Sequence, residues 1–507
     1  MLKSNLGDGR RFQKLALAVA TAIGLSLGGQ AHAAAPNVLF VVVDDLAAHM
    51  PGVKTPNLDA LRAQGVSFER TYTQYPVCGQ SRASFLTGMR PNSIGHQQNF
   101  ERFRCTLPDV VTLPQHFKNQ GYDSVRIGKL YHQNVPTGMG KPGPDDAASW
   151  SRTFNPLGKD HALAGQIVNH TPGEGLGMAM AYLKADVRDD ELTDGVSVND
   201  ALSVLAENQN KDDPLFLAVG FYRPHVPEVV PARYFDLYSD KVLERIEKQL
   251  RTGQPFDDLL FAAKNSVVAD MGTLPEHRRE FLRAYYAAVS YMDAQLGRLV
   301  EGLKKTGAYD NTIIVFTADH GFMLGQHGLW EKTTLFEGAV NVPLVISAPQ
   351  FRLQAKVVDK PVELLDVYPT VLELAGMAQN SANQGTSLVP LMQDPHAASW
   401  QKPAFSQIFG GRSVRTERYR YTEWGNAFGL GLLGVELYDY SLPDPESKNL
   451  VRDPAYRDVV ASLHRQIEQV TPLQNGEVRE TPFIQRPQGP AIPRGPRPAV
   501  KADPCQG

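Results

Sequence analysis

The run from Asn37 to Val43, apolar after its first residue, constrains the fold of this chain more than any other feature. Continuous apolar runs rich in valine are typical of strands buried on both faces of a parallel sheet. Further strand candidates occur at Ser124–Ile127, Leu215–Val219 and Thr312–Phe316, the last two of them mainly apolar, with helical patterns between several of them. This alternation predicts an α/β fold with a large, mostly parallel sheet sandwiched by helices.

Ionisable side chains follow each of these four runs at its carboxyl end. They are, in chain order, Asp44 and Asp45, then Lys129 and His132, then His225, then Asp319 and His320. Open α/β sheets bind ligands beyond the carboxyl ends of their strands. Any one of these residues alone is more often a solvated turn, a surface lysine or a structural histidine. Together they predict one polar site at one edge of the sheet.

A cysteine-containing segment, Val77 to Gly88, lies between the first two runs. Ser81 is a candidate N-cap of a helix and Gly88 a candidate end of the same helix. A group at Cys78 then faces the positive end of a helix dipole, where backbone N–H groups attract anions. Arg82 can reach the same place as a permanently charged, planar donor. The segment therefore predicts a nucleophile beside an oxyanion-binding site.

The pattern of the chain changes after Pro390. Short strand candidates and one helix candidate follow it, at Phe405–Gln407, Arg412–Thr416, Tyr419–Trp424, Glu436–Tyr440 and Val459–Val470. They predict a small C-terminal α+β domain with an antiparallel sheet. The predicted parts of the chain are a signal peptide at 1–33, a catalytic α/β domain at 36–395, an antiparallel subdomain at 400–484 and a tail rich in proline and arginine at 485–507.

The first 33 residues have the composition of an export signal. Basic residues come first, an apolar stretch from Leu15 to Leu27 follows, and Ala31-His32-Ala33 fits a cleavage site. The pair Arg10-Arg11 leaves two export routes open, the general secretory route and the twin-arginine route. We therefore expect the protein to be periplasmic or secreted.

The composition is that of a soluble globular protein, with 507 residues and a formal net charge of −3. No strong attraction to nucleic acid is expected at this charge, and no internal apolar run is long enough to span a membrane. An odd, low count of three cysteines, Cys78, Cys105 and Cys505, argues against a disulfide framework. Whether Cys105 pairs with Cys505 stays open, and one cysteine is left for chemistry.

Several segments of the chain resemble the sulfatase family of the alkaline-phosphatase-like superfamily. Cys78 to Arg82 resembles the signature Cys-x-Pro/Ala-x-Arg, with Gln80 where proline or alanine is usual. The other resembling segments are Asn37–Asp45, Thr55–Asp59, Gly121–His132, Phe316–Gly321, Gly325–Lys332 and Leu437–Leu450. The pair Asp319-His320 and the segment Tyr222 to His225 resemble the iduronate-2-sulfatase-like branch most closely. The resemblance covers roughly residues 36 to 470.

This resemblance implies a sulfuric ester hydrolase that releases inorganic sulfate from a sulfated sugar. A formylglycine-generating enzyme would oxidise Cys78, and the metal-bound hydrate of the formylglycine would attack the sulfur. The implied metal ligands are Asp44, Asp45, Cys78, Asp319 and His320. Ca²⁺ is usual in the family and suits carboxylate oxygens. Mn²⁺ or Mg²⁺ are alternatives, since a histidine nitrogen is a less natural calcium ligand.

The catalytic residues that the resemblance implies are Cys78, Arg82, Lys129, His132, His225 and Lys332. Arg82 and Lys129 would compensate charge near the hydrate. His225 and Lys332 would contact the sulfate and protonate the leaving oxygen. His132 would take a proton from the remaining hydroxyl, which expels the sulfate and restores the aldehyde.

Two other functions are compatible with the same sequence. The first is a phosphonate monoester or phosphodiester hydrolase on the same scaffold. The second is a non-catalytic protein that binds sulfated glycans, if Cys78 is not converted. The set His132, His225 and Lys332 favours catalysis, because binding alone does not need positioned proton carriers. Substrate choice is expected to depend on loops in residues 133–190, whose composition is rich in glycine, proline and aspartate.

Overall fold

The computed structural model describes Met1 and residues 35–95, 99, 102–211, 213–351, 356–425 and 432–471. The chain divides between Ala35 and Pro36 into two units, and the helices and strands of the described residues belong to the second. Apart from Met1, the predicted signal segment 1–33 lies outside the described residues, as do the tail 485–507 and Cys505. Export and the boundary at 395–400 stay predictions, and the pairing of Cys105 with Cys505 stays open.

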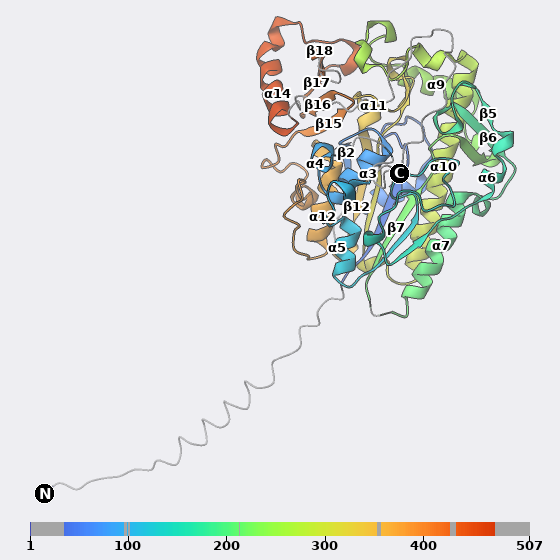
Figure 1. Cartoon of the computed structure of the whole chain (residues 1–507), viewed down its shortest axis with the longest axis vertical. Coiled ribbons are helices and arrows are strands. Elements are labelled where there is room, and N and C mark those ends of the chain that lie inside the picture. The colour runs from blue at the N-terminus through green and yellow to red at the C-terminus, as the bar shows by residue number, and fades with distance from the viewer. Residues whose placement is uncertain are drawn as a thin grey trace. The chain divides into compact units, whose positions relative to one another are not determined.

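A nine-stranded sheet forms the centre of the second unit (Figure 1). Its strand order is β13-β2-β12-β9-β1-β7-β3-β4, with β14 also paired to β2. The strands are β1 (Asn37–Val43), β2 (Val66–Tyr72), β3 (Asp123–Gly128), β4 (Arg152–Phe154), β7 (Leu215–Phe221), β9 (Thr312–Ala318), β12 (Asn341–Ser347), β13 (Lys356–Val358) and β14 (Val362–Glu363). Strand β12 runs antiparallel to β2 and β9, and the other described pairs are parallel. The predicted mostly parallel sheet is confirmed.

The four strands that end in ionisable residues are consecutive in this sheet, in the order β9, β1, β7 and β3. Val43 pairs with Ala318 on one side and with Phe221 on the other, and Gly128 pairs with Gly220. Because neighbouring parallel strands end at the same edge, the residues that follow them are brought together there. The prediction of a shared edge is confirmed.

Helices cover both faces of the sheet, with α5 and α12 on one side and α7 and α10 on the other (Figure 1). The α-helices are α2 (Pro56–Arg62), α3 (Cys78–Thr87), α4 (Pro91–Ile94), α5 (Leu113–Asn119), α6 (Lys159–Ala162), α7 (Thr193–Asn208), α8 (Ala232–Phe235), α9 (Asp240–Leu250), α10 (Pro275–Lys305), α11 (Glu337–Val340), α12 (Val367–Leu374), α13 (Val389–Gln393) and α14 (Arg457–Val470). The apolar side chains that recur along α10 from Phe281 to Leu303 are buried. Their three-to-four spacing puts these side chains on one face of the helix.

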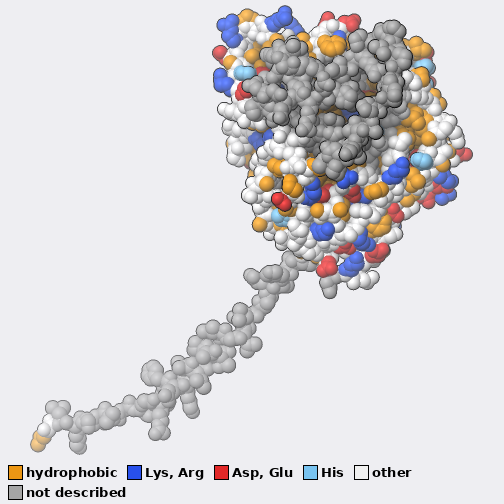
Figure 2. Space-filling model, in the orientation of Figure 1, with side chains coloured by type: hydrophobic (Ala, Val, Ile, Leu, Met, Phe, Trp, Pro, Cys, Tyr) orange, Lys and Arg blue, Asp and Glu red, His pale blue; other side chains and the backbone are white. Residues whose placement is uncertain are grey.

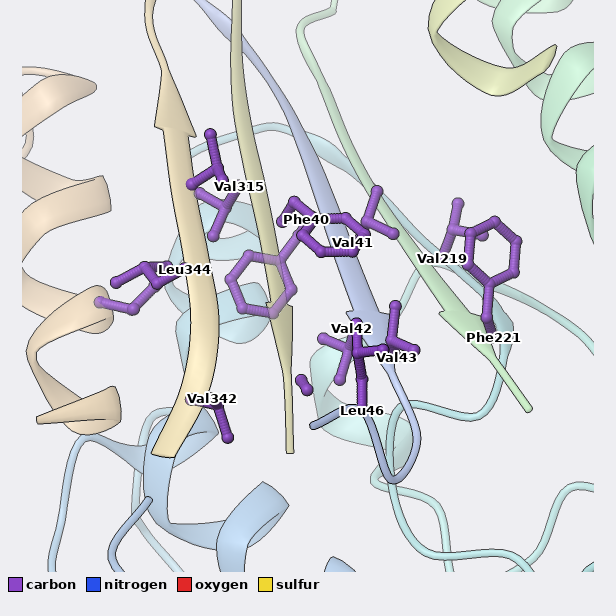
Figure 3. Packing of buried hydrophobic residues seen from close by; sticks show 14 of the residues in the cluster. Phe40, Val41, Val42, Val43, Leu46, Val219, Phe221, Val315, Val342 and Leu344 are labelled. Carbon is purple, nitrogen blue, oxygen red and sulfur yellow. The ribbon is translucent and has the colours of Figure 1, made fainter. Parts of the chain in front are cut away.

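The centre of the core is β1, whose residues Phe40 to Val43 are fully buried. Figure 3 shows them among Val219 and Phe221 of β7, Val315 of β9, and Val342 and Leu344 of β12. Burial of each such side chain contributes about 1.5–3 kcal/mol. The strand therefore gives Asp44 and Asp45, which follow it, a rigid support.

The segment 133–190, predicted to consist of loops, also contains short strands. Strands β5 (Val168–Asn169) and β6 (Ala181–Ala185) form a three-stranded sheet with β8 (Glu228–Pro231). The prediction was incomplete here because the strands are only two to five residues long. Their pairing partner β8 also lies far along the chain, so no local pattern marks them.

The C-terminal part contains the predicted antiparallel sheet. Its strands pair in chain order and are β15 (Ala404–Ile408), β16 (Gly411–Arg415), β17 (Tyr419–Gly425) and β18 (Leu432–Asp439). The predicted helix forms as α14. Arg420 of β17 forms a partly buried ion pair with Glu337 of α11, and Tyr72 donates to Glu337 at 2.8 Å. These contacts connect the small sheet to the large one.

The described surface carries both signs of charge. On the face shown in Figure 2, basic and acidic side chains are interspersed, in keeping with the net charge of −3. Among the helices of the described ranges, none combines the length and the apolar character that crossing a membrane requires.

Gly128, the last residue of β3, offers a test of how the sheet places Lys129. Its φ is +71°, and a Cβ atom there would lie 2.3 Å from the carbonyl oxygen of Gly220, which also accepts the N–H of Lys129. We expect Gly128→Ala to lower the free energy of unfolding by at least about 2 kcal/mol, because strain and a backbone clash add. Denaturant unfolding measures this loss.

Gly121→Ala is the matched control for that prediction. Gly121 has a φ of +89° but open space around its Cβ position. It should show only the cost of the left-handed backbone, about 1–2 kcal/mol. Equal losses in the two variants would show that the close approach of Gly220 has no energetic effect.

Candidate active site

Cys78 is the first residue of α3, with Val77 at the N-cap position and Gly88 at the left-handed C-cap. The predicted end at Gly88 is confirmed, but the predicted N-cap at Ser81 is wrong, since Ser81 lies inside the helix. Its hydroxyl donates instead to the carbonyl oxygen of Asp319 and accepts from Thr73 at 2.9 Å. The Ser81 hydroxyl, predicted to cap the helix, thus bonds to a residue that is distant in the sequence. Cys78 still lies at the positive end of the helix.

A residue from outside α3 binds the start of this helix. Asn99 Oδ1 accepts the backbone N–H of Gly79 at 2.9 Å. The first N–H groups of a helix have no partner within it, so this bond satisfies one of them. Twenty residues separate the two positions, and no spacing rule connects them, so the sequence did not single out Asn99.

Asp44 and Asp319 are fully buried and share the guanidinium of Arg82. Arg82 Nη2 lies 3.0 Å from Asp44 Oδ1, and Arg82 Nε lies 2.8 Å from Asp319 Oδ2. Lys129 Nζ lies 2.5 Å from Asp44 Oδ2. Burial by itself raises the pKa of Asp44, but Lys129, His225 and Arg82 outweigh burial and hold this pKa well below its ordinary value. Asp44 is therefore a permanent carboxylate.

Asp45 is also fully buried, but its charge is less compensated. Its Oδ1 accepts from Lys332 Nζ at 2.6 Å, whereas its Oδ2 accepts no hydrogen bond from any residue in the described ranges. Burial raises the pKa of Asp45 to about 7, although Lys332 and His320 oppose this shift. A buried carboxylate with an unused oxygen is costly unless a cation binds it.

Cys78 Sγ lies inside this group of charges as a buried free thiol. It is 3.2 Å from His320 Nε2, 3.4 Å from Lys332 Nζ and 4.0 Å from Asp45 Oδ1. His320 Nδ1 faces the carbonyl of Gly321 at 3.0 Å, so it carries the proton and directs Nε2 toward the thiol. Burial lowers the pKa of His320, but Asp319 and Cys78 raise it to about 9. A cation at Nε2 would have to displace a proton.

His225 and His132 face the same charges from β7 and β3. His225 Nε2 lies 4.0 Å from Asp45 Oδ2, and its Nδ1 donates to the carbonyl of Val226 at 2.6 Å. Burial, with Lys332, lowers the pKa of His225 well below its usual value. Burial, with Lys129, does the same for His132. Both rings are therefore neutral near pH 7 and can accept a proton.

The segment that carries His225 is held by residues that the sequence did not single out. Asp194, at the start of α7, accepts the backbone N–H groups of Tyr222 and Arg223 at 2.8 and 2.9 Å. Arg223 Nη1 then donates to the carbonyl of His225 at 2.9 Å. Asp194 lies 28 residues before Tyr222 in the chain, so only the folded structure connects them.

The donor atoms of this site form two groups, each compact enough to hold a cation. Two groups have ligand atoms within 4.8 Å of one another, Asp44 with Asp45, Cys78 and His225, and Cys78 with Asp319 and His320. Cys78 belongs to both groups, so the five predicted ligands lie in two groups that share it. The carboxylates of Asp44, Asp45 and Asp319 suit a hard dication, and Oδ2 of Asp45 accepts no bond from the described residues. His225, predicted as a proton carrier, also lies in the first group.

The site opens to solvent on the side of Lys332. The side chain of Lys332 is 16% exposed and that of His225 is 7% exposed, whereas Asp44, Asp45 and Asp319 are at most 1% exposed. Among these side chains, Lys332 is therefore the most accessible to a ligand that approaches from solvent.

A family model described as sulfatase matches residues 36–377, and a second, described as N-sulphoglucosamine sulphohydrolase, C-terminal, matches residues 325–472. The chain belongs to the sulfatase family. It is therefore an enzyme that hydrolyses sulfuric esters, as predicted. The cluster around Cys78 lies within the residues that the first match covers.

Known sulfatases share most of the length of this chain. A sulfatase of Formosa agariphila is 32% identical over 420 residues, which cover 77% of this chain and 79% of that protein. The iduronate 2-sulfatase of Homo sapiens is 28% identical, over 80% of this chain and 88% of that protein. The solved phosphonate monoester hydrolase of Silicibacter pomeroyi has a TM-score of 0.67 at 24% identity, over 86% of this chain and 94% of that chain. At this identity the likeness shows the fold alone, and it confirms the predicted alkaline-phosphatase-like architecture.

Proposed function

We propose that this sulfatase releases inorganic sulfate from a sulfated sugar, with a formylglycine made from Cys78 as the nucleophile and Ca²⁺ as the metal. Mn²⁺ and Mg²⁺ are the alternative ions. The observation that carries the proposal is the buried cluster in which Cys78 Sγ lies within 4.0 Å of His320, Lys332 and Asp45. The likeness to an iduronate 2-sulfatase supports a sugar substrate. The predicted signal segment supports export to the periplasm or beyond.

In the proposed reaction, the buried side of the site binds the metal and the side open to solvent binds the substrate. Asp44, Asp45, Asp319 and His320 would hold the dication, which would polarise the sulfate oxygens and neutralise their charge. Arg82 holds Asp44 and Asp319 in place through its two ion pairs. Substrate would bind at the open side, above residue 78.

Lys332 is the proton donor of the open side near pH 7. Burial lowers the pKa of Lys332, but Asp45 and Cys78 outweigh burial and raise this pKa well above its ordinary value, so the side chain stays an ammonium ion. It can contact a sulfate oxygen and give a proton to the leaving oxygen. His225 is neutral with its proton on Nδ1, so it must first accept a proton at Nε2 before it can donate one.

His132 is the base of the proposed reaction. After the sulfuryl group has moved to residue 78, one hydroxyl remains on that residue. The neutral ring can take the proton of this hydroxyl, and loss of the proton expels the sulfate. An unmodified cysteine has no such hydroxyl, so it cannot expel the sulfate in this way. Turnover therefore requires that Cys78 is converted, although Gln80 replaces the usual proline or alanine.

The test is a comparison of sulfate and phosphonate esters on one preparation. Natively expressed enzyme, loaded with Ca²⁺, is assayed on a panel of sulfated saccharides, an aryl sulfate and an aryl phosphonate. We expect at least one sulfated saccharide and the aryl sulfate to have a higher kcat/KM than the phosphonate. Faster turnover of the phosphonate would contradict the proposal in favour of a phosphonate hydrolase. Binding of sulfated sugars without sulfate release would favour a non-catalytic protein.

A further inference from the structure

Lys332 is presented by a strained stretch of backbone. Glu331 and Thr333, the residues on either side of it, have φ angles of +67° and +69°. Non-glycine residues in this region cost about 1–3 kcal/mol each and persist only where the surrounding structure holds them. Strand β11 (Trp330–Glu331) pairs with β10 (Met323–Leu324), but this pairing ends before Lys332. Another contact must hold the lysine.

Asn265 makes that contact. Its side-chain Nδ2 donates to the carbonyl oxygens of Trp330 at 2.6 Å and of Lys332 at 2.7 Å, one on each side of Glu331. Next to it, Thr334 Oγ1 donates to the carbonyl of Ala263 at 2.8 Å. Residues 263–265 are therefore bound to the backbone of Trp330 and Lys332, on either side of Glu331, and to the side chain of Thr334, which follows Thr333.

The segment with Asn265 is itself anchored. Ala263 is buried in a cluster with Leu259, Leu329 and Phe336, which includes residues of the C-terminal sheet. A clamp built on a packed segment can hold its partner in one position, whereas one built on a free loop could not. The segment is thus able to resist the strain at Glu331.

We propose that Asn265 is a positioning residue that holds the ammonium group of Lys332 over residue 78. The inference rests on the proposed function, in which Lys332 is the proton donor. Lys332 Nζ lies 2.6 Å from Asp45 Oδ1 and 3.4 Å from Cys78 Sγ, so a backbone shift of about 1 Å would remove it from the reacting atoms. A displacement of that size costs about 100-fold in rate.

The test is a double-mutant cycle on the calcium-loaded enzyme. Asn265→Asp keeps the shape of the side chain but removes both donors, and Asn265→Ala removes the side chain. We expect each to lower kcat/KM for an aryl sulfate by about 10- to 100-fold. Each should weaken the binding of inorganic sulfate, measured by calorimetry. In a Lys332→Met background the same substitutions should cost nothing further, because they act through Lys332.

Two controls separate positioning from general damage. Ser266→Ala removes a neighbouring hydroxyl whose bonds to the described residues lie within its own turn, with Val268 at 3.0 Å, and should leave kcat/KM unchanged. Thr334→Val removes the adjacent bond to Ala263 and serves as a substitute test if the Asn265 variants do not fold. Like Asn265→Ala, it should lower kcat/KM at least severalfold. Additive losses in the cycle, or unchanged kinetics in Asn265→Asp, would overturn the proposal that Asn265 positions Lys332. Unchanged kinetics and sulfate binding in Lys332→Met would instead overturn the role of Lys332 in the proposed function.

Discussion

Replacement of Cys78 by alanine is expected to reduce sulfate release at least about a thousand-fold, because the nucleophile is removed while the rest of the site remains. Cys78 Sγ lies where the oxygen of a formylglycine would lie, within 3.4 Å of both His320 Nε2 and Lys332 Nζ. Alanine has no atom at this position. Single-turnover and steady-state release of sulfate from an aryl sulfate measure the loss.

Mass spectrometry of the peptide that contains residue 78 provides the companion measurement. The natively expressed protein should contain an aldehyde at this position, at least in part, and its fraction should scale with kcat. The Cys78→Ala variant should keep part of the calcium-dependent stability of the parent, because Asp44, Asp45, Asp319 and His320 remain as ligands after residue 78 is lost. An active protein with a fully alkylatable thiol at residue 78 would defeat the formylglycine proposal.

Replacement of Asp45 by asparagine is the second large effect we expect. The variant should lose sulfatase activity by at least about a thousand-fold, together with the stabilisation that calcium confers on the parent. Asp45 contributes the one carboxylate oxygen of the site, Oδ2, that accepts no bond from the described residues. An amide in its place carries no charge for a dication. At a calcium concentration one hundred times the Kd, the parent should gain about 2.7 kcal/mol of stability.

Unfolding with and without a chelator measures this linkage, and Asp59→Asn is the matched control. Asp59 makes an exposed ion pair with Arg62 at 3.1 Å, away from the cluster, so its replacement should leave the calcium effect unchanged. Repeating the titration with Mn²⁺ and Mg²⁺ identifies the ion that the parent prefers. A calcium effect of full size in Asp45→Asn would show that the cation binds elsewhere.

Chain order and apolar patterning were enough to predict the fold and the edge where the site lies. Strands such as Asn37–Val43 are buried on both faces, so they read as continuous apolar runs whatever they pack against. The polar residues after them share one edge because parallel strands end together. The family motifs then marked Cys78, Arg82 and Lys332 within this edge.

The tertiary structure alone decided which residues hold the site together. Ser81, a cap by local rules, bonds to Asp319, and Asn99, Asp194 and Asn265 bind residues 20, 28 and 67 positions away. Such bonds form where packing brings distant segments of the chain together, and no periodicity or capping rule predicts them. The sequence by itself therefore determined the chemistry that is present, through residue type and strand order. The folded structure determined the distances at which that chemistry can operate, because these arise from long-range packing.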